Sequence, residues 1–164
     1  MIKIDDFIGI INIPDLYGDA AANQAIREKF NLYIADYTEY FLRDLFGDDF
    51  YDSYASDITG SAVTKWVDLR AKLTKPCARY IYFNFIRHNT TQTTPGGEVQ
   101  ANFENAVIVT NQVKLIEQWN RMSTEAGRVI EFLQDNPTDY PDFDYYDTLM
   151  ENGLHPLSKI SIFQ

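Results

Sequence analysis

Apolar residues recur every three or four positions along much of the chain, and this spacing predicts helices. Two long helices are expected, over residues 20–45 and 105–134. Shorter helices are expected over residues 61–74 and from Thr74 through Ile86, with Pro76 in the permissive first turn of the later one. The apolar stripes of the two long helices are Ile26, Phe30, Tyr33, Ile34, Tyr37, Phe41 and Leu45, and Leu115, Trp119, Met122, Ala126, Val129 and Leu133.

The run Tyr80–Ile86 is apolar on nearly all sides, so its pattern suits either a buried helix or a strand. Its length and the proline near its start favour a helix. Gly47 is expected to end the first long helix, and Asn136-Pro137 the second. Residues 48–60 and 136–147, rich in acids and aromatics, are interpreted as connections, the latter as a loop or a short helical turn.

Both ends of the chain are strand-like. Ile2 and Ile4 flank Lys3, and Asp5 is a candidate cap for a short helix that follows. The tail from Ser158 to Phe163 alternates polar and apolar residues. The prediction is a mainly α fold: one domain over residues 1–164, a helical bundle with two long helices, a protruding loop or β-arm at residues 89–104, and a C-terminal extension at residues 136–164.

The segment Arg87–Val107 turns abruptly polar between two apolar helices. A structureless segment of this length in a compact domain is either disordered or has a binding role. Its threonines suit a β-arm, and Gly96-Gly97 would let the chain turn back. We expect this loop to order on a partner, with the tail and the acidic loop as further contact sites. The interface candidates are Thr90, Thr91, Thr93, Thr94, Gly96, Gly97, Val99, Tyr140, Phe143, Ile160, Ile162 and Phe163.

Charge narrows the possible partners. The net charge is -10, which disfavours unassisted binding to nucleic-acid phosphates and to acidic membranes, and fits a basic protein partner or simple solubility. The 11 Tyr and 11 Phe residues hint at broad contact surfaces, although about half of these rings are expected to fill the core. The acidic N-terminus does not resemble a signal peptide and no segment is long enough to span a membrane, so a soluble protein made in a cytoplasm is expected.

Candidate chemistry is sparse. The single cysteine, Cys77, lies on an apolar face and cannot form an internal disulfide. His88 is explained by capping a helix C-terminus, and His155 lies in a turn before Pro156. The other groups considered are the acids Asp48, Asp49 and Asp52, the acids Asp139, Asp142, Asp144 and Asp147, and the turn Pro95-Gly96-Gly97. Neither acidic group has the spacing of a calcium loop, and the turn lacks the residues of a phosphate-binding loop. We expect no enzyme activity, no cofactor and no metal; the acids are a solvated face or a docking patch for a basic partner.

Several segments together resemble one family. They are the opening IKIDDFIGIINIP, the helix end YFLRDLFGDDFYDSY, the stretch KPCARYIYFNFIRHNTTQTTPGGEV and the helix ENAVIVTNQVKLIEQWNRM. Over roughly residues 1–135, this order of elements is similar to that of head–tail connector (adaptor) proteins of tailed bacteriophages, including those of Bacteroidetes and the crAss-like group. Residues 136–147 match nothing in that family.

The resemblance implies a non-enzymatic virion protein at the head–tail junction. It would form a ring, expected to be twelvefold, that docks on the portal protein and carries the next tail or ring protein. DNA would pass through its channel without specific binding. The rival hypothesis is a small acidic protein-binding module or DNA mimic. That protein would be a monomer or dimer, with its acids on one face at phosphate-like spacing.

Overall fold

The computed structural model describes residues 2–11, 24–59, 64–89, 91–94, 97–100, 111–145 and 156. These residues are mainly helical, which confirms the predicted fold class. A short 3-10 helix comes first, and the only strands in the described part of the chain form one antiparallel hairpin. The elements are η1 (Ile4–Phe7), α1 (Gln24–Phe46), α2 (Asp48–Thr59), α3 (Thr64–Asn89), β1 (Thr91–Thr94), β2 (Gly97–Gln100) and α4 (Asn111–Asp135).

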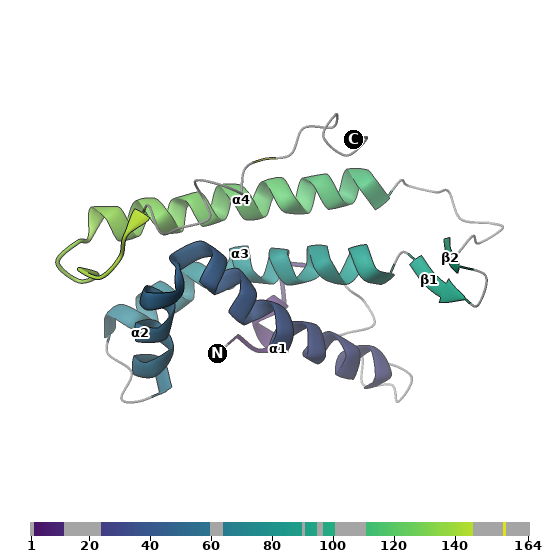
Figure 1. Ribbon diagram of the computed structural model, residues 1–164, viewed down its shortest axis with the longest axis horizontal. Coiled ribbons are helices and arrows are strands. Elements are labelled where there is room, and N and C mark those ends of the chain that lie inside the picture. Colours follow the sequence, from purple (N-terminus) through teal and green to yellow (C-terminus); the bar gives the residue numbers. More distant parts are fainter. Residues whose placement is uncertain are drawn as a thin grey trace.

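Helix α3 is the centre of the fold, because α1, α2, α4 and η1 all pack against it. Figure 1 shows α3 and α4 side by side along the longest axis, with α1 on the other side of α3. The hairpin lies beyond the end of α3, outside the helical body (Figure 1). The sequence reaches this hairpin directly from α3, so the helix sets where the hairpin leaves the body.

The core forms where the apolar stripes of the three longest helices meet η1. The predicted stripes are confirmed: Phe30, Ile34, Phe41 and Leu45 of α1 are buried, as are Met122, Ala126, Val129 and Leu133 of α4. Phe7 carries η1 into this core, where its ring meets that of Phe30 edge-on at 5.1 Å between centroids. Each fully buried large apolar side chain stabilises the fold by about 1.5–3 kcal/mol relative to an exposed one.

Residues 48–59 form a helix, so the prediction of an irregular connection here is wrong. Gly47 does end α1, with a positive φ of 78°, but α2 begins at the next residue. The apolar side chains Phe50, Tyr54 and Ile58 lie four residues apart and all face the core. This helical spacing is present in the sequence, but the aspartates and aromatics between these positions obscure it.

Helix α3 runs unbroken through Pro76, so two predicted helices are one helix of 26 residues. The described chain therefore has three helices longer than 20 residues, and the prediction of two long helices is corrected. A proline inside a helix removes one backbone hydrogen bond. The continuous buried face of Trp66, Leu69, Leu73, Cys77 and Ile81 explains why packing holds the helix together across this position.

The N-terminal segment also differs from the prediction. Lys3, and not Asp5, is the residue that precedes the first helical residue. The backbone of Lys3 is extended, but Ile4 already belongs to η1, so the expected strand-like start does not continue past Lys3. Asp6 accepts a hydrogen bond from the backbone N–H of Lys3 at 2.8 Å, which closes the start of η1. The predicted C-terminal strand, residues 158–163, lies outside the described residues.

Candidate functional site

The β1–β2 hairpin is a two-stranded sheet with no third strand in the described part of the chain. Its register pairs Thr91 with Gln100 and Thr94 with Gly97. Of the predicted interface residues, Thr91, Thr93 and Thr94 fall in β1, and Gly97 and Val99 fall in β2. Each strand thus pairs along one edge only, which leaves the other edge able to accept a further strand.

The remaining candidates divide into two groups. Thr90, Gly96, Ile160, Ile162 and Phe163 lie outside the described residues, as does His155. Tyr140 and Phe143 are described, and both belong to the chain's own packing.

Tyr140 is only 3% exposed, although it lies in a loop. Its ring packs edge-on against Trp66 at 5.7 Å and Phe132 at 5.7 Å, and its hydroxyl donates to the carbonyl of Lys65 at 2.7 Å. Phe143 meets Phe50 edge-on at 5.3 Å. The loop after α4 therefore anchors that helix to α2 and α3, and Tyr140 is a core residue in this chain.

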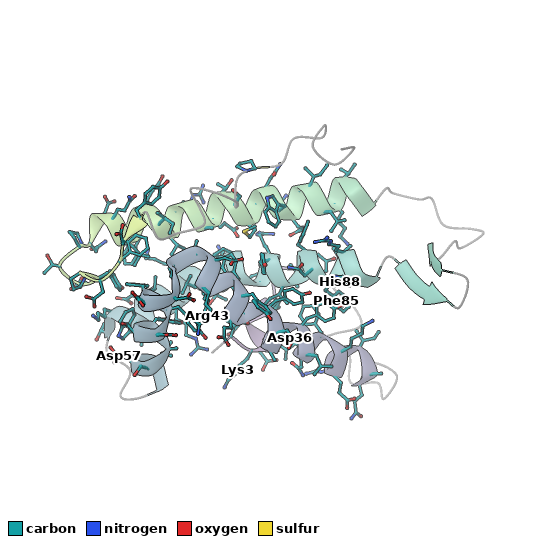
Figure 2. The ribbon with its side chains drawn as sticks, viewed as in Figure 1. Lys3, Asp36, Arg43, Asp57, Phe85 and His88 are labelled. Atoms are coloured by element: carbon teal, nitrogen blue, oxygen red, sulfur yellow. The ribbon has the colours of Figure 1, made fainter. Side chains whose placement is uncertain are left out.

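An aromatic cluster supports the end of α3 that leads into the hairpin. Tyr33 and Tyr37 of α1 stack at 5.6 Å, and the ring of Phe85 meets Tyr33 edge-on at 5.4 Å. His88 lies 5.9 Å from Tyr33, and its Nδ1 is 3.4 Å from the hydroxyl of Tyr37. Figure 2 shows Phe85 and His88 near this end of α3. The cluster fixes the base of the hairpin, and His88 packs here as part of it.

Three carboxylates bind one guanidinium where α1 meets α2, and together with the neighbouring Asp49 we call this set the acidic face. Arg43 binds Glu39 at 2.8 Å, Asp48 at 2.8 Å and Asp52 at 3.0 Å. Asp49 is exposed beside them. The hydrogen bonds to Glu39 and Asp48 raise the pKa of Arg43 above its ordinary value. Four negative charges meet one positive charge, so the acidic face keeps a net charge of -3.

The α3–α4 seam has the opposite character. Helix α3 carries six Lys and Arg residues but one Asp. A shallow groove of about 150 Å³ lies along the seam, and an adjoining hollow of about 390 Å³ shares Lys72 with it. We call the first the basic groove; it is lined by Lys72, Lys75, Pro76, Glu125, Arg128 and Val129.

Three exposed cations, Lys72, Lys75 and Arg128, surround the buried Pro76 and Val129 of the groove. Among the described residues, no carboxylate forms an ion pair with any of the three. The Lys72 ammonium lies 4.3 Å from the centre of the Phe132 ring. The one acid of the groove, Glu125, is bound by Arg79 at 2.8 Å. The groove therefore presents an excess of positive charge in a protein whose net charge is -10.

Two buried titratable side chains, Cys77 and Tyr54, pack in the core of the described part of the chain. Cys77 is fully buried, and burial raises the pKa of its thiol to about 12. Burial likewise raises the pKa of Tyr54 to about 12. No group of three His, Cys, Asp or Glu side chains within the described ranges is arranged to hold a metal ion. The acids Asp48 and Asp52 instead bind Arg43, while Asp147 lies outside those ranges.

The sequence reading missed the basic groove. Lys72, Lys75 and Arg79 are spaced three and four apart, which places them on one side of a helix. The predicted helix break near Thr74 separates Lys72 from Lys75 and Arg79, so the sequence alone does not show that the three share one helix face. Arg128 joins them only through the pairing of α3 with α4, which no local pattern reveals.

Comparison with known proteins assigns the chain to a family. Residues 42–153 match the model of DUF6712, a family of unknown function, which covers more than half of the chain, so the chain belongs to this family. No curated protein and no solved structure matches. In the described part of the chain, every helix is too short or too polar to cross a membrane.

Proposed function

We propose that this member of the DUF6712 family is a structural virion protein of a tailed phage. Copies of the chain form a ring at the head–tail junction, dock on the portal protein and carry the next tail or ring protein. The protein does no chemistry of its own in this role and needs no cofactor. The proposal rests on the order of elements that resembles phage connector proteins, together with the hairpin described above.

The hairpin is the observation that carries the proposal. An isolated two-stranded hairpin is marginally stable in water, and it gains stability when a further strand or a packing surface is added. Strands β1 and β2 pair only with each other in the described chain, and they lie beyond the end of α3. In the proposed ring this hairpin is the β-arm, and it adds to a strand of a neighbouring copy or of the portal.

The charge of the chain suits a DNA channel. A surface with a net charge of -10 repels phosphates, so the genome passes without sticking. In the proposed ring the groove cations of α3 are covered by contacts with a neighbouring copy and do not meet DNA.

Deletion of residues 91–100 tests the role of the arm. The helices pack through α1, α3, α4 and η1, so the deletion should leave the helical circular dichroism signal intact and abolish ring formation on the portal. Single proline substitutions in β1 test the arm more locally than the deletion, because proline removes one backbone N–H donor from the strand. Successive N–H groups along a strand point to opposite edges, so Gln92→Pro and Thr93→Pro each block a different edge. A ring that still assembles from the deletion variant would contradict the proposal.

A second candidate function is an acidic module that binds a basic protein. The acidic face favours it, because three carboxylates bind one guanidinium and, together with the exposed Asp49, leave a net charge of -3. Such a protein would act as a monomer or dimer. Mixing the purified chain with its portal distinguishes the two, because the module predicts no co-sedimentation with portal particles and the connector predicts many copies for each portal ring.

A further inference from the structure

The acidic face and the basic groove are built from different helices and do not neutralise each other within the chain. The acidic face lies on α1 and α2, whereas the groove lies between α3 and α4. Figure 1 shows α1 and α4 on opposite sides of α3. Among the described ion pairs, none joins a member of the acidic face to a cation of the groove.

We propose that the basic groove of one copy is the docking site for the acidic face of a second copy. The contact would place Asp48, Asp49 or Asp52 against the groove cations. This inference rests on the proposed function, because it assigns the two surfaces through which neighbouring subunits of the ring meet.

Charge complementarity selects this occupant. The side chains of Asp48 and Asp52 remain 77% and 65% exposed despite their contacts with Arg43, so their carboxylates can accept further hydrogen bonds. Lys72, Lys75 and Arg128 are exposed donors with no carboxylate partner among the described residues. The buried Pro76 and Val129 beneath them give the groove an apolar floor, which lowers the local dielectric constant and strengthens an ion pair formed above it.

The same distribution disfavours a twofold-symmetric dimer through either surface. A symmetric contact would place acidic face against acidic face, or groove against groove, and like charges would repel. Because α1 and α4 lie on opposite sides of α3, one neighbour cannot meet both surfaces at once, so the contact is heterologous. A repeated heterologous contact closes into a ring when its rotation permits. The contact would also cover the groove cations, so that DNA in the channel would not meet them.

Two neutralised variants test the contact in the full-length protein. The acid-neutral variant carries D48N, D49N and D52N, and the base-neutral variant carries K72Q, K75Q and R128Q. Each retains one intact surface. A control variant removes three exposed acids that lie outside the acidic face, through D5N, E28Q and D142N. Sedimentation velocity at ~0.05 M and ~1 M NaCl would measure self-association, because screening over a few ångströms at high salt weakens such contacts.

We expect the wild type and the control to associate at low salt, and each neutralised variant to associate at least about tenfold more weakly. An equimolar mixture of the two variants should form a one-to-one dimer and grow no further, because only one intact pair of surfaces remains. A carbodiimide cross-link between Lys72 or Lys75 of one copy and Asp48, Asp49 or Asp52 of another would identify the contact directly. Isotope labelling of one variant would separate links between copies from links within one copy.

Two results would overturn the inference. The inference is wrong if the wild type stays monomeric at ~1 mM. It is also wrong if the acid-neutral and base-neutral variants associate as strongly as the control. If the acid-neutral and base-neutral variants still form rings on the portal, the proposed contact between acidic face and basic groove is wrong while the proposed function stands. If the wild type forms no ring on the portal either, the proposed function fails with it.

Discussion

The Cys77→Ala variant should be less stable than the wild type at neutral pH and more stable than the wild type at alkaline pH. The thiol is fully buried between the packed helices, and burial raises its pKa from an ordinary 9.0 to about 12. A hydrogen bond with the side chain of Thr38 opposes this rise without cancelling it. The folded protein therefore holds this proton across a pH range in which the unfolded chain releases it.

The sign of the effect follows from proton linkage. The thiol has a higher pKa in the folded protein than in the unfolded chain. Its contribution to stability is therefore fully present below the pKa of the unfolded chain, and it is lost as the pH rises toward the pKa in the folded protein. Each pH unit corresponds to about 1.36 kcal/mol for one proton. Between pH 9 and pH 12 the thiol alone should cost the folded state about 4 kcal/mol.

At pH 7 the Cys77→Ala variant should be less stable than the wild type by about 1 kcal/mol, the usual cost of a small core truncation. By pH 10.5 the wild type should have lost about 2 kcal/mol through the thiol, so the variant should then be more stable by about 1 kcal/mol. Urea unfolding followed by circular dichroism at pH 7, 9 and 10.5 would measure both differences. Burial is the largest cause of the raised pKa values of Tyr54 and Tyr80, and it is common to both proteins, so most of their contribution cancels. The smaller repulsion that the Cys77 thiolate adds to each is lost in the variant.

Val129→Ala is the matched control, because it truncates a buried side chain that does not titrate. Its stability relative to the wild type should not change sign with pH. A Cys77→Ala variant that keeps a constant deficit from pH 7 to pH 10.5 would refute the assignment of a buried, protonated thiol.

Three further substitutions test the packing, and two of them have a matched control. Arg79→Met should destabilise the fold by about 2 kcal/mol, because it leaves a half-buried carboxylate of α4 unpaired, whereas Arg121→Met at an exposed pair should cost less than about 0.5 kcal/mol. Leu69→Ala should cost about 2–5 kcal/mol, against under about 0.5 kcal/mol for the half-exposed Val67→Ala. Tyr140→Phe removes one hydrogen bond and should cost about 1 kcal/mol. Thermal and urea unfolding would measure each, and equal effects within either matched pair would contradict the burial assigned here.

The sequence predicted those parts of the fold that local periodicity determines. The stripes of α1 and α4 are regular over many turns, and Gly47 marks a true helix end. The same reasoning failed at Pro76, where a local signal for a break was outweighed by the apolar face that continues from Leu73 to Ile81. Tertiary packing contributes several such buried side chains, which together exceed the cost of one lost helical hydrogen bond.

The candidate surfaces were harder to predict because they combine distant residues. The Thr-rich loop was recognisable from composition, and its backbone pairing is local. The acidic neighbours of Tyr140 predict a surface loop and hence an interface role for its ring. Its ring instead reaches back to Trp66 on α3, 74 residues earlier in sequence, and only the fold brings the two together.

Electron microscopy of the chain co-expressed with the portal protein from the same genome would test the central proposal most directly. The connector account predicts portal particles with an added ring of density below the portal, with mass for many copies of this chain and with density for residues 91–100 against a neighbour. Bare portal rings beside a free monomer of this chain would contradict it.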